Sequence, residues 1–327
     1  MHIIPNKLKI GDTIRIVAPS SSFGLISQGV RDVANQRFKE LGLNLSFSKH
    51  VEEKDEFISS SIKSRVEDLH KAFANKNIKG IFTVIGGFNC NQLLPYLDWN
   101  LIKKNPKIFI GFSDTTALQN AILAKTGLVT YYGPAYSTFG QKLHFDYTLD
   151  CFKKCLMNNQ PIILKPSPKW TDDAWYLDQD KRILIENSGY WNISNGEAEG
   201  TIIGGNLCTL NLLQGTPYFP LKKNVILFIE DDDETDYVHF DRDFESLLQM
   251  FEIKNIRGII FGRFQNKSAM TLTKMKRLIK IRPQLSKIPI IANVDFGHTS
   301  PIITFPIGGT TRLTVKNKLI KITVLKH

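Results

Sequence analysis

One serine stands where the pattern of the chain would expose a nucleophile. Residues 107–110 are mainly apolar and favour a buried strand, Gly111-Phe112-Ser113-Asp114 follows at once, and residues 114–125 favour a helix. A strand that turns directly into a helix lifts one side chain out of the sheet and directs free helix N–H groups at whatever that side chain attacks. Serine hydrolases present their nucleophile in this way. In the alternative interpretation, Ser113 only caps the N-terminus of the helix.

A nucleophilic serine needs a base that accepts its proton, and His298 is the histidine best placed for that task. The chain has seven histidines, most of them in polar or helical surroundings typical of the surface. His298 instead follows the apolar segment 288–293 in a Gly-His loop. Loops at a sheet edge carry many catalytic groups because they can reach a bound substrate. The alternative is a loop histidine whose ring nitrogens bond to backbone groups.

The base in turn needs a carboxylate to orient it, and Glu230 ends the apolar strand predicted over residues 225–229. Glu230 also begins a run of five acidic residues, the last three of which favour a solvated turn. Clustered carboxylates can also bind Mg²⁺ or Ca²⁺, although neither an EF-hand spacing nor a Walker lysine motif is present. In a third interpretation Glu230 orients His298. The order Ser113, Glu230, His298 is that of Ser–acid–His hydrolases.

Acyl transfer also needs N–H donors that hold the oxyanion. Gly86-Gly87 follows the strand predicted over residues 80–85, and there bare backbone could approach a substrate and offer an N–H group. The N–H of Asp114 would be the second donor. The two glycines could alternatively cradle a phosphate, but the rest of a dinucleotide fingerprint is absent.

Strands and helices alternate through the first half of the chain. Continuous apolar strands in this order predict a parallel sheet that helices cover on both faces. Ligands bind such sheets at the carboxyl ends of the strands, where Gly86-Gly87 and Ser113 both lie. The predicted strands cover residues 13–18, 43–48, 80–85 and 107–110, and the predicted helices cover residues 30–41, 59–75, 91–97, 114–125 and 148–157.

The second half repeats the alternation after a segment of different character. Residues 159–189 are rich in proline, tryptophan and short polar residues, which predicts a connecting segment with functional loops. We therefore predict an α/β protein with an N-terminal parallel-sheet domain at residues 1–158, this connecting segment with a substrate loop, and a C-terminal mixed α/β domain at residues 190–327. Predicted elements beyond it are strands at residues 200–206, 225–230, 258–262, 288–293, 312–315 and 319–324, with helices at residues 206–213 and 240–251.

Composition narrows the class of protein. Of the 327 residues, 42% are hydrophobic and 22% are charged, which is ordinary for a globular protein. The N-terminus lacks the apolar region of a signal peptide, and no apolar run approaches the length of a membrane span. We expect a cytoplasmic protein without a membrane partner. Cys151 and Cys155 lie one helical turn apart with no second Cys or His pair at zinc spacing, so the four cysteines are expected as free thiols.

The net charge of +11 raises the question of an acidic partner. The basic residues are dispersed, except at residues 274–282, where apolar residues recur near helical spacing and predict an amphipathic helix with a solvated basic face. No recognisable nucleic-acid motif accompanies the charge, and we expect no nucleic-acid partner. A basic protein also attracts anionic small substrates through its field.

Taken together, the motifs resemble the LD-carboxypeptidases, a serine peptidase family, along essentially the whole chain. The branch of microcin C self-immunity peptidases looks nearest, because cell-wall enzymes of the family typically carry an Arg-Gly-Gly-Tyr-Gly loop where this chain has Ile85-Gly86-Gly87-Phe88-Asn89. The matching stretches are residues 17–21, 85–91, 111–116, 204–207, 227–231 and 297–301.

The resemblance implies roles for particular residues. Ser113 would be the nucleophile, Glu230 the acid and His298 the base, with oxyanion donors on the backbone near Gly87 and Asp114. It further implies a Rossmann-like N-terminal domain, a mixed α/β C-terminal domain, a homodimer, and neither a metal nor another cofactor.

The same resemblance implies a peptide or peptidyl-nucleotide substrate. The immunity branch stacks a loop tryptophan on the adenine of its substrate, and Trp175 is the residue expected in that role, with Trp170 and Trp191 as rivals. In the alternative interpretation, all three tryptophans simply anchor loops against the core. Gly86 and Asn206 are the other expected substrate contacts. Alternatives are a murein tetrapeptide substrate, a non-catalytic nucleotide-binding protein, and a metal-dependent enzyme at the acidic run.

Overall fold

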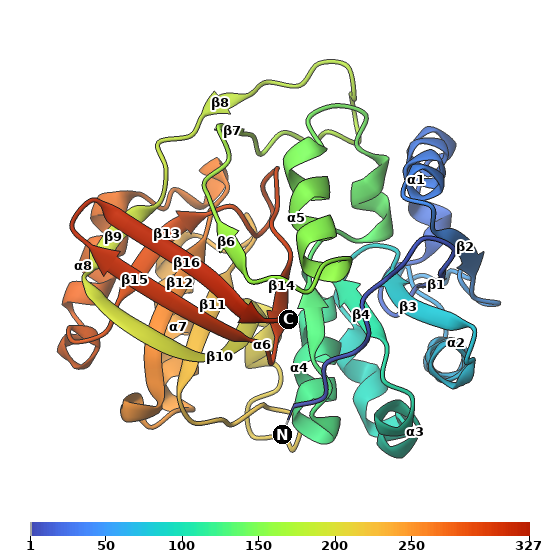
Figure 1. Ribbon diagram of the computed structural model, residues 1–327, viewed down its shortest axis with the longest axis horizontal. Helices are drawn as coiled ribbons and strands as arrows, with labels where there is room; N and C mark the ends of the chain where they lie inside the picture. Colours follow the sequence, from blue (N-terminus) through green and yellow to red (C-terminus); the bar gives the residue numbers. More distant parts are fainter. Residues whose placement is uncertain (1) are drawn as a thin grey trace.

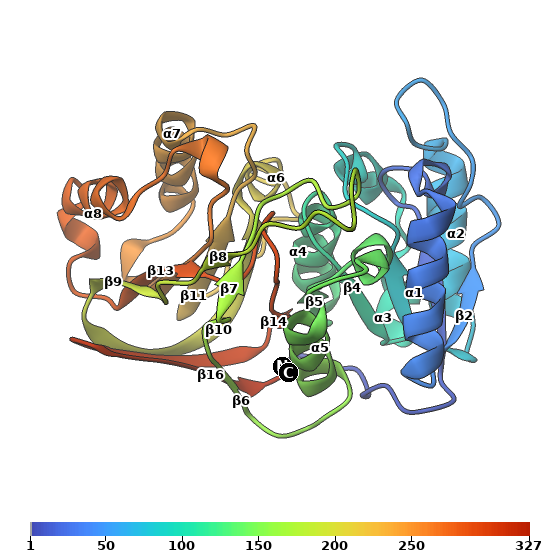
Figure 2. The same ribbon diagram turned by 90° about the horizontal axis from the view of Figure 1, so that it is seen from above.

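Two β-sheets lie side by side in the computed structural model, which describes residues 2–327, and helices flank both of them (Figure 1). The first half of the chain builds one sheet and most of the second half builds the other (Figures 1 and 2). This arrangement confirms the predicted α/β fold class. The third sheet is a two-stranded ribbon in the connecting segment, formed by β7 (Lys169–Trp170) and β8 (Ile185–Glu186).

The first sheet has the strand order β14-β5-β4-β3-β1-β2. Its sequential strands are parallel, as the alternating pattern predicts, and β14 alone pairs antiparallel, with β5. The strands are β1 (Thr13–Val17), β2 (Asn44–Phe47), β3 (Ile78–Thr83), β4 (Ile108–Gly111), β5 (Thr130–Tyr132) and β14 (Phe305–Ile307).

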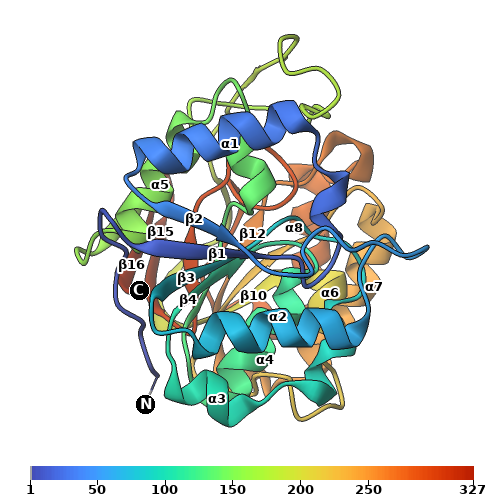
Figure 3. The same ribbon diagram turned by 90° about the vertical axis from the view of Figure 1, so that its right-hand side faces the viewer.

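Helices cover both faces of the first sheet because side chains of a strand alternate between its faces. In β3, Ile81 and Phe82 are both fully buried and belong to different core clusters. In Figure 3 helix α1 (Gln28–Glu40) lies on one side of these strands, and α2 (Ile62–Ala74) and α3 (Trp99–Lys104) lie on the other. The buried apolar residues of α5 (Asp146–Leu156) share a core cluster with those of α1, and most of those of α4 (Thr115–Thr126) share the other cluster with α2 and α3.

The second sheet has the order β6-β16-β15-β10-β11-β12-β13-β9. Strands β10 to β13 are parallel, and the others pair antiparallel, so this half is mixed as predicted. The strands are β6 (Ile162–Leu164), β9 (Trp191–Ser194), β10 (Gly196–Asn206), β11 (Val225–Glu230), β12 (Ile256–Gly262), β13 (Ile290–Val294), β15 (Thr310–Lys316) and β16 (Leu319–Lys326). Its helices are α6 (Leu207–Asn211), α7 (Tyr237–Gln249) and α8 (Leu272–Lys280).

Local predictions mostly hold in this half. The tail forms the predicted hairpin of β15 and β16. Helix α8 buries Met275, Leu278 and Ile279 on one face, as its amphipathic pattern indicates. The helix predicted to run to residue 213 ends earlier, at Asn211.

Three features differ from the predicted layout. The helix predicted over residues 91–97 is a 3₁₀ helix, Cys90–Tyr96, and Pro95 inside it lacks the N–H that an α-helix would use. Strand β6 of the connecting segment pairs with β16 in the second sheet. Strand β14, from the last tenth of the chain, joins the first sheet. The other 3₁₀ helices are η1 (Phe23–Leu25), η3 (Tyr136–Gly140), η4 (Ile253–Asn255), η5 (Asn266–Ser268) and η6 (Pro283–Leu285).

Within residues 2–327, every helix is too short or too polar to cross a lipid bilayer.

Candidate active site

Ser113 occupies the turn between β4 and α4 in a strained backbone conformation. Its φ is +61°, in the left-handed region that costs a non-glycine residue roughly 1–2 kcal/mol. The turn also needs Gly86, since a Cβ there would lie 2.8 Å from the Ser113 Cβ. The Ser113 Oγ lies 3.0 Å from His298 Nε2, and the Thr116 N–H bonds to the Ser113 carbonyl instead of the hydroxyl. The interpretation of Ser113 as a helix cap is therefore wrong.

His298 joins Ser113 to Glu230. Its Nδ1 lies 2.9 Å from Glu230 Oε2, so one arrangement of protons satisfies both contacts: Nδ1–H donates to the carboxylate and the Ser113 hydroxyl donates to Nε2. The imidazole packs against the ring of Phe112, with 5.5 Å between centroids. Gly297 has a φ of +112°, and a Cβ at this position would approach Glu230 Oε2 to 3.0 Å. The loop thus needs glycine directly before His298.

Glu230 is 1% exposed at the carboxyl end of β11. Burial lowers the pKa of His298, but the charge and hydrogen bond of Glu230, with smaller contributions from Asp232 and Asp231, outweigh it and raise that pKa to about 9. An opposite charge at hydrogen-bond distance stabilises the imidazolium ion. In this arrangement His298 can accept the proton of Ser113, and Glu230 can stabilise the charged ring that results.

The Gly86-Gly87 turn lies against Ser113. Gly87 has a φ of +149°, and a Cβ on it would lie 2.3 Å from the Ser20 Oγ, so only glycine fits there. Across residues 2–327, the N–H groups of Gly87 and Asp114 have no hydrogen-bond acceptor in the protein. Free N–H groups beside a nucleophile can hold a negatively charged oxygen.

Asn206 lies at the end of β10 in register with Glu230, but its amide is already engaged. Its Oδ1 accepts from the Thr209 N–H at 3.1 Å and caps α6, while its Nδ2 donates to Asp231 Oδ1 at 3.2 Å. Burial, then the charges of Glu230 and Asp232, raise the pKa of Asp231 to about 7. Asn206 therefore lies beside Glu230 on the neighbouring strand, and its contact with a substrate stays a prediction.

The three tryptophans that were candidates for stacking on the substrate lie in different surroundings. Trp175 is half-buried and packs against the core cluster that includes the buried residues of α1 and α5. Its ring is nearly perpendicular to that of Tyr176. Trp170 carries the Arg263 guanidinium over its ring, 4.8 Å from the centroid. Trp191 lies in β9 and packs against the other core cluster, which includes the buried residues of α2 and α3. Among the three, Trp175 alone belongs to the loop of the connecting segment between β7 and β8.

The acidic run offers one group of potential metal ligands among residues 2–327. Atoms of Cys208, Asp231 and Asp232 lie within 4.8 Å of one another. Burial raises the pKa of the Cys208 thiol, and burial likewise raises that of Asp231. A metal ligand must lose its proton, so these raised pKa values work against metal binding at neutral pH, more strongly for the thiol than for Asp231, whose pKa is about 7. Farther along the run, Asp233 pairs with Lys267 at 3.4 Å.

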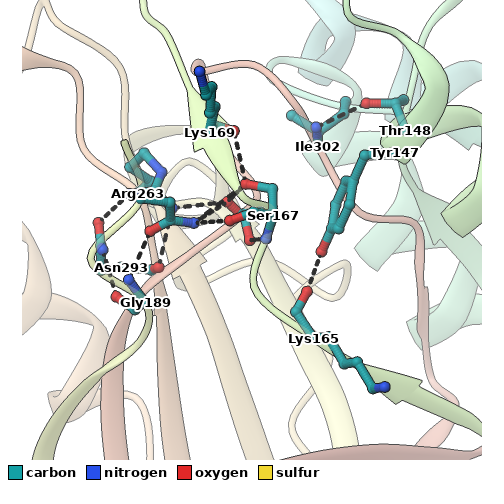
Figure 4. Close-up of polar contacts among 11 residues, drawn as sticks. Tyr147, Thr148, Lys165, Ser167, Lys169, Gly189, Arg263, Asn293 and Ile302 are labelled. Atoms are coloured by element: carbon teal, nitrogen blue, oxygen red, sulfur yellow. Dashed lines mark hydrogen bonds and ion pairs between the residues drawn. The ribbon is translucent and has the colours of Figure 1, made fainter. Parts of the chain in front are cut away.

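A buried network that the sequence analysis missed anchors the loop before His298 (Figure 4). The Asp295 carboxylate accepts from Arg263 Nη2 at 2.7 Å, and from the N–H and hydroxyl of Ser167 at 2.9 and 2.7 Å. Arg263 also donates to the Asn293 side chain. Asp295 and Arg263 are both almost fully buried. An aspartate directly after an apolar strand was the available signal, but its partners come from distant segments.

Three surface cavities lie outside or beside the group formed by Ser113, Glu230 and His298. Two surface hollows of about 610 Å³ are lined by α2 with Tyr96 and by the outer face of the second sheet, and neither includes Ser113, Glu230 or His298. A smaller cavity of about 200 Å³ abuts the His298 loop at Ser300 and Pro301. Chemistry therefore identifies the site better than volume does.

Comparison with known proteins identifies the family of this chain. Residues 14–133 match the LD-carboxypeptidase N-terminal domain, and residues 199–313 match the LD-carboxypeptidase C-terminal domain. The chain belongs to the LD-carboxypeptidase family. A Bacillus subtilis member named as a putative carboxypeptidase, YocD, is 49% identical over 98% of this chain and 99% of its own length. The resemblance stated from the sequence is confirmed, and the chain belongs to a family of peptidases.

The chain is also similar to members of the immunity branch of the family. The microcin C7 self-immunity protein MccF of Escherichia coli is 33% identical over 97% of this chain and 94% of its own length. The crystal structure of an MccF-like protein from Bacillus anthracis superimposes with a TM-score of 0.98 at 50% identity, covering 99% of this chain and 100% of that one. A structure of MccF in complex with aspartyl sulfamoyl adenosine has a TM-score of 0.88 at 31% identity and covers 99% of both chains.

Cell-wall members are also similar to this chain. A Bacillus subtilis protein named as a "probable murein peptide carboxypeptidase" is 30% identical over 96% of this chain and 92% of its own length.

Proposed function

We propose that this protein is a serine hydrolase with a Ser113–His298–Glu230 triad that cleaves an amide bond. The observation that carries the proposal is the chain of contacts from Ser113 Oγ through the His298 ring to the buried Glu230 carboxylate. Such a chain activates a serine hydroxyl that is otherwise a weak nucleophile.

The reaction follows from these contacts. Ser113 Oγ attacks the substrate carbonyl while His298 Nε2 takes its proton, and Glu230 stabilises the resulting imidazolium. The carbonyl oxygen, now negative, accepts from the N–H groups of Gly87 and Asp114. His298 then gives its proton to the leaving nitrogen, and the C–N bond breaks. Water, deprotonated by His298, attacks the acyl-Ser113 ester, and collapse of that intermediate returns the proton to Ser113 Oγ.

The substrate that we propose is an aminoacyl or peptidyl nucleotide amide. Supporting it are the 50% identity to an MccF-like protein and the complex of MccF with aspartyl sulfamoyl adenosine. The Gly86-Gly87-Phe88-Asn89 turn is that expected of the immunity branch. Trp175 is the proposed stacking partner of the base, because it lies half-buried in the loop between β7 and β8. Gly86 and Asn206 complete the proposed contacts.

A murein tetrapeptide cut before its terminal D-alanine is the second candidate. The similarity to a murein peptide carboxypeptidase favours it. Both substrates place a scissile amide beside a carboxyl or nucleotide end, so the proposed triad chemistry would serve either.

One experiment separates these candidates. Purified protein receives aminoacyl-sulfamoyl adenosine and a murein tetrapeptide in parallel, and mass spectrometry identifies the products. We expect cleavage of the nucleotide amide with a kcat/KM at least tenfold above that for the tetrapeptide. The reverse ranking would assign the protein to cell-wall recycling. Tight nucleotide binding without turnover of either compound, and without labelling of Ser113 by a serine-reactive probe, would identify a non-catalytic binding protein.

The remaining properties that we propose follow family expectation. The protein acts in the cytoplasm as a homodimer, uses no metal or other cofactor, and binds neither nucleic acid nor membrane. Full turnover after dialysis against EDTA is the expected result, because the proposed chemistry uses only side chains and backbone N–H groups. Loss of turnover that Mg²⁺ restores would instead assign the chemistry to the acidic run.

A further inference from the structure

Asp114 begins helix α4, yet its carboxylate does not cap that helix. Within the described chain, the first turn of α4 sends no hydrogen bond to the Asp114 side chain, although an aspartate at a helix N-terminus usually accepts one. Asp98 at the start of α3 shows the usual arrangement, with its carboxylate accepting from the Leu101 N–H at 2.9 Å. The Asp114 side chain therefore has a different task.

One oxygen of Asp114 collects three hydrogen bonds from two other segments. Oδ2 accepts from the N–H groups of Asn89 at 2.9 Å and Cys90 at 2.8 Å, and from the Ser20 hydroxyl at 2.5 Å. Asp114 is only 2% exposed. Hydrogen bonds to a charged carboxylate in such a setting are roughly twice as strong as neutral ones. The carboxylate thus fixes the turn after Gly86-Gly87 to the residue that follows the nucleophile.

The surrounding contacts hold the same turn from its other side. Arg65 donates to the Asn89 carbonyl at 3.2 Å, to its side-chain oxygen at 2.8 Å, and to the Pro19 carbonyl at 3.1 Å. The Ser21 N–H donates to the Gly86 carbonyl at 3.2 Å. Between these anchors, Gly86 packs so closely on Ser113 that a Cβ would collide with it. The position of the Gly87 N–H relative to Ser113 is consequently set by Asp114 and its partners.

We propose that the Asp114 carboxylate is a positioning residue for the oxyanion hole, locking the Gly87 N–H at a fixed place beside Ser113. This inference rests on the proposed hydrolase function. A preorganised donor stabilises charge that develops only in the transition state, so a loosened turn lowers kcat and leaves substrate binding intact. Both N–H groups of the hole then depend on one residue: Asp114 offers its own N–H and holds the other through its side chain.

The test compares Asp114→Asn with Asp98→Asn. The first substitution keeps the size of the side chain but removes the charge that strengthens all three bonds. We expect kcat, and the rate at which a fluorophosphonate labels Ser113, to fall by the same factor, about 10- to 100-fold; complete loss of an oxyanion donor costs about 10²- to 10³-fold. KM should stay within about twofold of wild type. Asp98→Asn changes the same residue type at the start of α3, where the carboxylate caps its own helix, and both rates should equal those of wild type.

Ser20→Ala provides the second variant, because it removes one bond from the far end and leaves the charge in place. It should lower both rates about three- to tenfold, the loss of one modest hydrogen bond. Its result decides the matter if Asp114→Asn does not fold.

Three results would overturn the proposal. The first is that Asp114→Asn and Ser20→Ala both keep the wild-type kcat and labelling rate, and the second is that KM rises while kcat is unchanged. The third is that the unfolded fraction of each variant explains its entire loss of rate. The proposed function fails separately. A wild-type protein that is never labelled at Ser113 refutes the hydrolase, whereas a labelled wild type with an equally fast Asp114→Asn refutes only the positioning role.

Discussion

At the scale of single residues, the pair of Glu230 and His298 decides how the proposed activity depends on pH. A base must be unprotonated to accept the Ser113 proton, and the pKa of His298 is raised to about 9. The imidazolium form is therefore common at neutral pH. We expect kcat/KM of the free enzyme to rise with pH from 6, to reach half its maximum near pH 9 and to level off only above that, as measured on whichever substrate the enzyme cleaves. A profile that is flat from pH 6 to 9 would contradict this.

Glu230→Gln tests the cause of that pKa. Without the carboxylate charge, burial lowers the pKa of His298 with little opposition, so the pH profile should move toward 6.5 or below. We also expect kcat to fall by about 10⁴-fold, because a glutamine no longer orients or stabilises the imidazolium. Glu199→Gln, at an exposed residue of β10, is the control and should leave both the profile and kcat unchanged. An unchanged pH profile in Glu230→Gln would show that charges other than Glu230 raise the pKa of His298.

The same pair contributes to folding stability with a definite sign. The pKa of His298 is higher in the folded protein, about 9, than its ordinary 6.5. Its contribution is complete below pH 6.5 and disappears as the pH rises through 9. The difference in free energy of unfolding between wild type and His298→Gln, measured in urea, should shrink over that interval. A difference that grows with pH would mean that the folded protein keeps His298 neutral.

At the scale of secondary-structure elements, strand ends position the residues of the proposed triad, and several of these strand ends were predictable. The apolar strand before Ser113 and the apolar strand ending in Glu230 appear as β4 and β11, because each is continuous and short. The left-handed φ of Ser113 was not predictable from its residue type. It follows from the close approach of Gly86, which comes from another strand end.

The network around Asp295 could not be predicted from the sequence either, because its partners come from separate segments: Ser167 lies 128 residues from Asp295, and Arg263 lies 32 residues away. Ser167 and Asp295 meet only when the connecting segment folds back over the second sheet. An isolated Asp, Arg or Ser in a sequence carries no periodic signal, in contrast to the apolar face of α8.

Asp295→Asn tests whether this network holds the connecting segment. It leaves the Arg263 guanidinium buried without its counter-charge, which should lower the free energy of unfolding by about 3–5 kcal/mol. Trypsin should then cut faster at Lys181 and Arg182 in the loop between β7 and β8. Urea unfolding and timed proteolysis give the two measurements.

Glu199→Gln is the matched control, since it removes the exposed partner of Arg312 and should change stability by no more than about 1 kcal/mol. If the two variants unfold at equal urea concentrations, the buried network is not a major anchor.

At the scale of the whole molecule, the site exists only where the two sheets meet. Ser113 ends a strand of the first sheet, and Glu230 ends a strand of the second. His298 lies on the segment that leaves β13 of the second sheet and enters the first sheet as β14 (Figure 2). The crossing segment thus ties the base to both sheets. The sequence indicated two α/β halves, but a three-residue strand such as β14 is too short to reveal its partner.

The assembly of the protein remains a prediction at this scale. One chain has a mass of 37.2 kDa, and light scattering after size exclusion should give about twice that value for the homodimer that we propose. A mass of one chain at micromolar concentration would contradict it. Turnover per chain that does not change across the dissociation range would show that each site is complete within one subunit.

The most direct measurement of the central claim is turnover by Ser113→Ala. With purified, folded variant and the substrate that wild type cleaves, we predict no cleavage above the uncatalysed rate by mass spectrometry, while binding of the substrate persists with nearly wild-type affinity. In wild type, quenching during turnover should trap an acyl group on the peptide that contains Ser113. Cleavage by Ser113→Ala at the wild-type rate would show that another group performs the attack.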